Sequence, residues 1–232
     1  MSDQLTSIPS DDPAPLPLSA SEDCRGVETR ALTKRLGGML VGLSEPDSGK
    51  APILGGRYRD LPNPGRRVGV LLDASAQHAG RRGREALAVS AHIMGVPARR
   101  VDALLKRVGL DEAAARRRVG KYSLGMRQRL GLAHVFVGDP EVQILDEPAN
   151  GLDPEGMRWL AGLLRDFADR GGTVLLSSHL LAEVEAVADR MIVIGGGRIQ
   201  AQGARRVADR DRTPSSRRTT SPRSTPCSTW PA

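Results

Sequence analysis

Apolar residues in the middle of the chain recur with the period of an α-helix. Four of them fall at i, i+3, i+4 and i+7 and so share one helical face: Val101, Leu104, Leu105 and Val108. The stretch 81–95 has a similar spacing, and Ser123 stands where it would cap a third helix. The pattern predicts a helical subdomain over about residues 80–138.

The residues that follow alternate short apolar runs with helical stretches. The runs are EVQIL, TVLLSS and RMIVIG, and a short hairpin follows the last of them. Strands that are apolar along their whole length are typical of a parallel sheet buried under helices on both faces. We therefore expect an α/β fold in which TVLLSS is a buried strand. Ligands of such sheets bind beyond the carboxyl ends of the strands, so the chemistry is expected just after EVQIL and TVLLSS.

Both ends of the chain are polar and of low complexity. Residues 1–26 are rich in Pro, Ser and Asp and are expected to be disordered, as is a basic tail over residues 204–232. The body between them, residues 27–203, is expected to be one domain. Cys24 and Cys227 lie in the two ends, which gives no support for a disulfide or a metal site.

The formal net charge of +7 comes mainly from the tail, which carries seven arginines against two aspartates. The body has no basic stripe with interleaved aromatic residues, so we expect no nucleic-acid partner, and an arginine tail that binds nucleic acid is a minor alternative. No apolar run reaches the roughly 18 residues of a membrane span, and the start of the chain lacks the order of a signal peptide. A cytoplasmic location follows as an expectation.

The first candidate site follows EVQIL, where two carboxylates stand side by side. Asp146 can hold Mg²⁺, and Glu147 can polarise a water molecule. His179 follows TVLLSS and is placed to contact a ligand at the same edge of the sheet. Taken one at a time, such residues are more often solvated turn or loop residues.

A second group of candidates lies at two helix starts. Ser123 is placed to cap a helix whose free backbone N–H groups attract an anion, and Gly125 lets a phosphate approach closely. The alternative is an ordinary serine-capped helix. Asp153 stands in the tight loop NGLDP, just before another helix.

The motifs YSLGMRQRLGLA, EVQILDEP, NGLDP and VLLSSH occur in this order along the chain. Their order and spacing within residues 27–203 resemble the ATP-binding subunit of a bacterial ABC transporter, of the exporter type found in drug efflux. The resemblance implies a P-loop NTPase-like parallel sheet flanked by helices, with a helical subdomain. It implies ATP and Mg²⁺ as ligands, a separate membrane permease as partner, and a homo- or heterodimer of nucleotide-binding domains. Such a subunit would lie peripherally on the cytoplasmic face of the cell membrane.

The resemblance implies a catalytic role for three residues. Asp146 would hold Mg²⁺, Glu147 would orient the attacking water, and His179 would contact the γ-phosphate. Catalysis of this kind is mostly positioning and charge stabilisation around the transferred phosphoryl group.

Four further positions would contact nucleotide or line its site in such a family member. Ser123 and Gly125 would act in trans, on the nucleotide bound by the partner domain. Asp153 would belong to the D-loop, and Asp73 would stand at the Q-loop position, where many members have glutamine.

The phosphate-binding loop is where the chain departs from the family. That loop needs Gly, four residues, then Gly-Lys-Ser/Thr, so that backbone N–H groups wrap the phosphates. The chain has two Gly-Lys pairs, Gly49-Lys50 and Gly120-Lys121, and both lack the first glycine and the hydroxyl residue. The residues at these positions are Ser44 and Ala51 for the first pair and Ala115 and Tyr122 for the second. We infer that the Walker A motif is missing, and we expect Lys50 to be a solvated turn residue.

The missing loop belongs to a longer gap. Residues 32–38, LTKRLGG, run directly into MLVGLSEPDSG, whereas in the family a strand, the P-loop and most of its helix stand between these stretches. A unit of roughly 30 residues is therefore expected to be lost near Gly38-Met39. A sheet without a central strand keeps unpaired edges and exposed apolar faces, so we expect a marginally stable or aggregation-prone domain.

Smaller departures point the same way. Leu36 replaces the aromatic residue that stacks on adenine, and Gln143 puts an amide inside the otherwise apolar EVQIL strand. Beyond residue 203 the chain continues as the Arg-, Ser-, Thr- and Pro-rich tail, as a shifted reading frame or a truncated end would.

Two functions remain open on this evidence. The first is the ATPase subunit of an exporter, impaired by the loss of Walker A. The second is a non-catalytic subunit or remnant that offers only Ser123 and Gly125 to the site of a partner.

Overall fold

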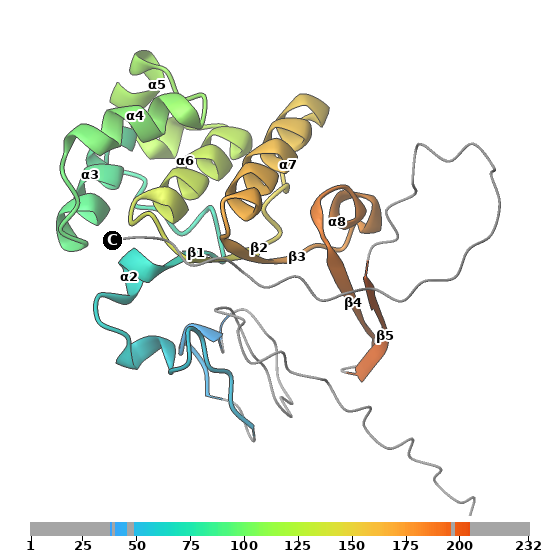
Figure 1. Ribbon diagram of the computed structural model, residues 1–232. Coiled ribbons are helices and arrows are strands. Elements are labelled where there is room, and N and C mark those ends of the chain that lie inside the picture. Colours follow the sequence, from blue (N-terminus) through green and yellow to red (C-terminus); the bar gives the residue numbers. More distant parts are fainter. Residues whose placement is uncertain (1–37, 39, 46–48, 196–197, 205–232) are drawn as a thin grey trace, which may run out of the picture.

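The computed structural model describes residues 38, 40–45, 49–195 and 198–204 (Figure 1). The expectations for residues 1–26, for Leu36 and for the tail beyond residue 204 fall outside these ranges. Two short 3₁₀ turns lie at Tyr58–Asp60 and Val119–Lys121. The other elements are α2 (Pro64–Arg67), β1 (Val68–Leu71), α3 (Gly83–Ile93), α4 (Arg99–Arg107), α5 (Glu112–Arg116), α6 (Leu124–Phe136), β2 (Val142–Asp146), α7 (Pro154–Asp169), β3 (Thr173–Ser177), α8 (Leu181–Val187), β4 (Arg190–Gly195) and β5 (Arg198–Ala204).

Helices α3, α4, α5 and α6 gather at one end of the molecule (Figure 1). The predicted apolar face of α4 points inward, since Val101, Leu104 and Leu105 are all buried. Tyr122, just before α6, contacts α5 because its hydroxyl donates a 2.6 Å hydrogen bond to the carbonyl oxygen of Ala114. The helices predicted from apolar periodicity are therefore confirmed.

Strands β1, β2 and β3 form a parallel sheet with β2 at its centre. The register places Val68 beside Val142 and Asp146 beside Ser177. Strand β2 is buried except for its last residue, Asp146. The expected α/β fold, a parallel sheet flanked by helices, is confirmed.

Helix α6 packs directly on β1 through a glycine. A Cβ atom at Gly69 would lie 2.4 Å from the carbonyl oxygen of Val135 in α6. No real Cβ atom tolerates such an approach, and the neighbouring atom is backbone, which cannot move aside cheaply. Gly69 therefore sets how close the helix lies to the sheet.

The two faces of the sheet are covered differently (Figure 1). On one face, Leu130 of α6 and Leu164 of α7 belong to the same buried cluster as Leu145 of β2. On the other face, residues 40–45 and 49–61, which are mostly turns and loops, bury apolar side chains such as Ile53 against β1 and β2. In the described part of the chain, long helices cover one face, and the other face is covered mostly by turns and loops beside the helical residues Gly38 and Leu40.

Strand β3 lies at the edge of the parallel sheet. Its residues from Thr173 to Leu176 are only partly buried. The expectation that TVLLSS is a buried strand is therefore wrong. The physical reason is its position, because none of the described strands pairs with β3 on the side away from β2.

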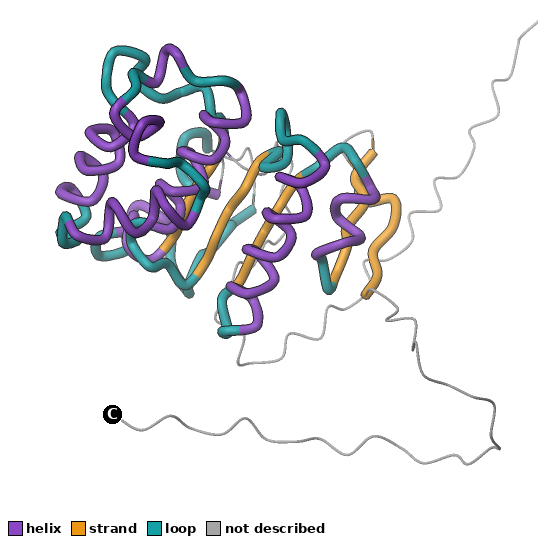
Figure 2. The backbone as a smooth tube through the Cα atoms, turned by 90° about the horizontal axis from the view of Figure 1, so that it is seen from above, coloured by secondary structure: helices purple, strands orange, loops and turns teal. Residues whose placement is uncertain are grey.

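Strands β4 and β5 form a separate antiparallel hairpin beyond β3 (Figure 2). RMIVIG is thus a strand, as predicted, but it does not belong to the parallel sheet. Ile192, Ile194 and Ile199 of the hairpin are 59%, 54% and 62% exposed. Arg165 of α7 forms a 2.8 Å ion pair with Asp189, directly before β4, which links the hairpin to the rest of the fold.

Candidate functional site

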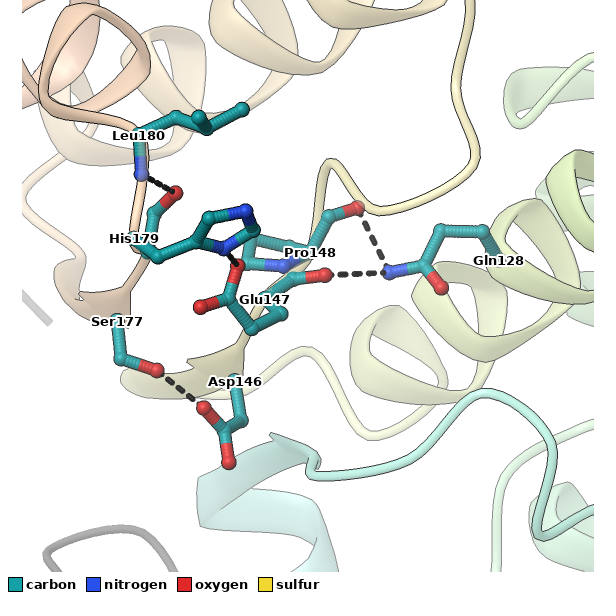
Figure 3. Close-up of polar contacts among 8 residues, drawn as sticks. Gln128, Asp146, Glu147, Pro148, Ser177, His179 and Leu180 are labelled. Carbon is teal, nitrogen blue, oxygen red and sulfur yellow. Dashed lines mark hydrogen bonds and ion pairs between the residues drawn. The ribbon is translucent and has the colours of Figure 1, made fainter.

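The carboxyl ends of β2 and β3 bring together the residues predicted to be catalytic (Figure 3). Asp146 ends β2 and Ser177 ends β3, and the parallel register sets them side by side. The Ser177 hydroxyl donates a short hydrogen bond to the Asp146 carboxylate. Both side chains are exposed at this edge of the sheet, where a ligand can reach them.

Glu147 begins the turn after β2 and is held by β3. Its backbone N–H donates to the carbonyl oxygen of Ser177 at 3.0 Å. Its carboxylate Oε2 lies 2.9 Å from Nδ1 of His179, which follows β3. The residue has a φ of 47°, a left-handed conformation that glutamate rarely adopts and that costs about 1 kcal/mol or more. Such strained positions cluster at functional sites.

The exposed start of α6 and the loop before α7 form a second group. The Ser123 hydroxyl accepts from the backbone N–H of Met126 at 3.2 Å, so Ser123 caps α6. A Cβ atom at Gly125 would lie 3.1 Å from the carbonyl oxygen of Gly151, so the helix start packs against that loop. Asp153 caps α7 by accepting from the N–H of Gly156 at 2.8 Å. Within the single chain, Ser123 and Asp153 thus serve as ordinary helix caps.

Asp73 lies in the loop after β1, at the carboxyl end of the strand that pairs with β2. Its carboxylate accepts from the backbone N–H of Ser75 at 2.7 Å. Hydrogen bonds from Ser75, the side-chain bond first and then the backbone bond, hold the pKa of Asp73 below its usual range. Asp73 therefore stays ionised and stabilises its own loop.

Two buried amides in this region were not identified as site residues from the sequence. Gln128 of α6 is 3% exposed, and its Nε2 donates to the carbonyl oxygens of Pro148 at 2.7 Å and Glu147 at 3.3 Å (Figure 3). Gln143 of β2 is fully buried, and neither its Oε1 nor its Nε2 has a partner in the described part of the structure. The partners of Gln128 are backbone carbonyls, which leave no trace in the sequence.

The oxygen ligands at the end of β2 suit Mg²⁺. This ion binds through one or two carboxylates and completes its shell with water and phosphate oxygens. Asp146 and the Ser177 hydroxyl offer such a partial set. Among the described residues, no three His, Cys, Asp or Glu side chains gather as a full metal site.

The Gly-Lys pair at residues 49–50 lies away from a helix start. Gly49 has a φ of 86°, and Lys50 is exposed in the loop segment that leads to Ile53. Lys50 is thus a solvated residue of that loop, as expected from its flanking sequence. Across the described ranges, no helix is both long and apolar enough to cross a bilayer.

Comparison with known sequences gives a consistent picture. The ABC transporter family model matches residues 36–150. The chain is 38% identical over 164 residues to the bacitracin transport ATP-binding protein BcrA of Bacillus licheniformis, which covers 69% of this chain and 53% of that protein. It is 37% identical over 173 residues to the Nod factor export ATP-binding protein I of Burkholderia lata, covering 72% and 56%. The chain thus spans about half the length of the curated relatives it matches.

Solved structures support the same fold. An ATP binding subunit of an ABC transporter aligns with a TM-score of 0.64 at 28% identity, over 72% of this chain and 71% of that chain. The ATP-binding cassette MJ0796, solved as a dimer in a post-hydrolysis state with ADP and Pi, aligns with a TM-score of 0.65 over 73% of this chain and 78% of that chain. Its 19% identity supports the fold alone. Sequence motifs, fold and relatives together identify this chain as an ABC transporter ATP-binding domain.

Proposed function

We propose that this domain serves as the ATP-binding subunit of a bacterial ABC exporter and works with a separate membrane permease, with its own ATP hydrolysis impaired. The observation that carries the proposal is the pairing at the ends of β2 and β3, where Asp146 meets Ser177 and Glu147 meets His179. The relatives named for bacitracin transport and Nod factor export support the export direction. The subunit would lie at the cytoplasmic face of the membrane, as part of a dimer of such domains.

Each residue of this group has a chemical task. Asp146 and the Ser177 hydroxyl would hold Mg²⁺, and a bound Mg²⁺–ATP would supply the phosphoryl group that passes to water. Glu147 orients the attacking water with its carboxylate, and His179 fixes that carboxylate through the 2.9 Å contact. The left-handed backbone at Glu147 aims the side chain back across the end of β3.

The impairment follows from the sequence, which has no Gly-x4-Gly-Lys-Ser/Thr loop. Without that loop, the phosphates lose the backbone N–H groups that bind them. The loss of a whole strand–loop–helix unit near Gly38-Met39 is supported by the only partly buried edge strand β3 and by the exposed isoleucines of β4 and β5. The apolar runs of β3 and β4 have a composition that suits a sheet interior.

A second candidate is a non-catalytic subunit that completes the site of a partner. The start of α6 favours this function, because Ser123 is exposed and the helix begins with an ordered cap. A capped helix N-terminus offers N–H groups and a positive dipole end to a phosphate. Ser123 and Gly125 would then act on nucleotide bound by a homologous domain with an intact P-loop.

Nucleotide binding tests the proposed impairment. A fluorescent ATP analogue is titrated with Mg²⁺ into the purified chain, with a complete ABC ATPase as positive control. We expect no saturable binding in the micromolar range, and Asp146→Asn is expected to change nothing. Micromolar binding that Asp146→Asn weakens would contradict the impairment.

Stimulation of a partner tests the second candidate. The chain is mixed with a homologous ATPase that has an intact P-loop, and hydrolysis is followed with increasing amounts of the chain. The second candidate predicts stimulation that Ser123→Arg abolishes, while Ser44→Arg, at another exposed serine, leaves it intact. Equal effects of the two variants on hydrolysis by the partner would contradict the proposal that Ser123 acts in trans.

A further inference from the structure

We propose that Gln128 is a positioning residue that ties the Glu147 turn to helix α6, so that the helix start and the catalytic carboxylate move as one body. The tie can be tested in the free chain. Its consequence for catalysis rests on the proposed function, because it needs a nucleotide at the start of α6.

The contact itself is buried and directional. Gln128 projects from the second turn of α6 toward the turn that follows β2 (Figure 3). Its Nε2 donates to the carbonyl oxygen of Pro148 at 2.7 Å and to that of Glu147 at 3.3 Å. The side chain is 3% exposed, so water does not replace these bonds easily.

The turn that Gln128 holds needs support from outside. Glu147 has a φ of 47°, and a glutamate leaves that conformation when nothing holds it. On the β3 side, its N–H is fixed by the carbonyl oxygen of Ser177 at 3.0 Å. On the helix side, Gln128 fixes its carbonyl oxygen. The strained residue is thus held at both ends, by two different elements.

A second contact, one helical turn closer to the start of α6, further restricts movement of the helix relative to the turn. A Cβ atom at Gly125 would lie 3.1 Å from the carbonyl oxygen of Gly151. A Cβ atom at Gly151 would lie 2.4 Å from the side chain of Leu124. The first two turns of α6 therefore touch the 147–151 turn at both of its ends.

This arrangement gives a route between two sites. A displacement of the start of α6, which carries Ser123, moves the backbone of Glu147 through Gln128. The Glu147 carboxylate in turn contacts His179 at 2.9 Å. In a dimer, docking of Ser123 on the partner's nucleotide would therefore reorient Glu147 and His179 of the same chain.

Hydrogen exchange of the full chain, followed by NMR without nucleotide, tests the tie. Gln128→Met keeps the length of the side chain but removes the donor. We expect exchange of the Glu147 and Asn150 amides to rise on the order of tenfold, as the loss of buried hydrogen bonds predicts. We also expect the ring ¹⁵N signals of His179 to shift, while amides in the middle of α7 stay unchanged.

The matched control is Gln77→Met. Gln77 also donates its Nε2 to the backbone of α6, at the carbonyl oxygen of Arg127, 3.3 Å away, but it does not contact the turn. This variant is expected to leave the Glu147 amide and the His179 signals as they are. Unchanged exchange at Glu147 in Gln128→Met, or equal effects of both variants, would overturn the proposal.

A measurement on the unmodified chain keeps the proposal testable if Gln128→Met does not fold. Gln128 Nε2 donates to two carbonyl oxygens and is buried, whereas Gln200 Nε2 donates to one, that of Gly195, and is exposed. Exchange of the Gln128 side-chain amide with solvent is therefore expected to be slower than that of Gln200 by on the order of tenfold or more. Exchange as fast as that of Gln200 would refute the tie. Neither outcome depends on whether the chain binds ATP, so failure of the proposed function is seen separately.

Discussion

Glu147 and His179 lie 32 residues apart in the chain and meet at 2.9 Å between Oε2 and Nδ1. The parallel register of β2 and β3 produces this contact, since each residue follows the end of its strand. The His179 side chain is 70% exposed and that of Glu147 36% exposed, so water screens the pair. Its value lies in orienting the carboxylate rather than in holding the fold together.

Removal of this pair is therefore expected to leave stability nearly intact. We predict that Glu147→Gln changes the free energy of unfolding by less than about 1 kcal/mol, because exposed ion pairs contribute little. Urea unfolding measures the change. Glu155→Gln, at an exposed glutamate of α7, is the control. A loss of several kcal/mol in Glu147→Gln alone would give Glu147 a structural role that the geometry does not predict.

His134 predicts a loss of stability in mild acid. Its Nδ1 lies 2.9 Å from the Ser90 hydroxyl, its buried Nε2 has no partner among the described residues, and burial lowers the pKa of His134 from 6.5 to about 4. The unfolded chain therefore binds a proton between these two pH values that the folded chain does not. The contribution of His134 to the free energy of unfolding is fully present above pH 6.5. It falls as the pH drops toward about 4, by up to about 3 kcal/mol.

The measurement is the free energy of unfolding in urea at several pH values. His134→Gln retains a partner for Ser90 and removes the titration, so this part of the slope between pH 6.5 and 4 is expected to disappear. His92→Gln, at the exposed end of α3, should keep it. An unchanged slope in His134→Gln would assign the acid sensitivity to other groups.

Gly69 predicts a large effect of a single methyl group. Gly69→Ala places a Cβ atom 2.4 Å from a backbone oxygen of α6, so the helix must move off the sheet. We expect a loss of roughly 1–3 kcal/mol in the free energy of unfolding, in the range of overpacked core positions.

Gly162→Ala is the matched control for this change. Gly162 lies within α7, and a Cβ atom there would meet nothing within 4 Å. Alanine in a helix interior is favoured over glycine by about 1 kcal/mol, so this variant is expected to be more stable. If both substitutions changed the free energy of unfolding in the same direction, the close packing at Gly69 would not control the helix position.

The exposed isoleucines of the hairpin predict self-association. Ile192, Ile194 and Ile199 are each more than half exposed on one small element. We expect the chain to bind a hydrophobic dye. We also expect it to melt below about 50 °C, at or under the lower end of the range in which mesophilic domains unfold. Dye fluorescence and light scattering during heating measure this.

Substitution of the hairpin residues separates their effect from that of other exposed apolar groups. Ile194→Thr combined with Ile199→Thr is expected to lower both dye binding and scattering. Ile93→Thr removes an isoleucine that is 75% exposed on α3, away from the hairpin. It should lower dye binding and light scattering much less than the hairpin substitutions do. A cooperative melt well above 50 °C in the unmodified chain would contradict the expected instability.

The sequence predicts local features well because neighbours in the chain decide them. Val101 and Leu104 fall on one face of α4 through spacing alone, and Ser123 caps α6 as its residue type indicates. The meeting of Asp146, Glu147 and His179 was also predictable, since the ends of adjacent parallel strands share one edge.

Features that depend on distant parts of the chain were missed or wrong. Leu175 and Leu176 have the composition of a buried strand, but burial also requires a neighbour on each side, and β3 has a described strand on one side only. Gln128 looks like a surface residue of a helix, because the carbonyl groups it binds belong to a turn some 20 residues later.

The division of the strands into two sheets also bears on how the molecule unfolds. No described strand pairing joins β3 to β4, and the Arg165–Asp189 ion pair is weak because the Asp189 side chain is 75% exposed. The segment from α8 to β5 can then open while α6, α7 and the parallel sheet stay folded, as a separate cooperative unit. The chain would lose its hairpin first on warming, and calorimetry would record two overlapping transitions where an unbroken sheet gives one.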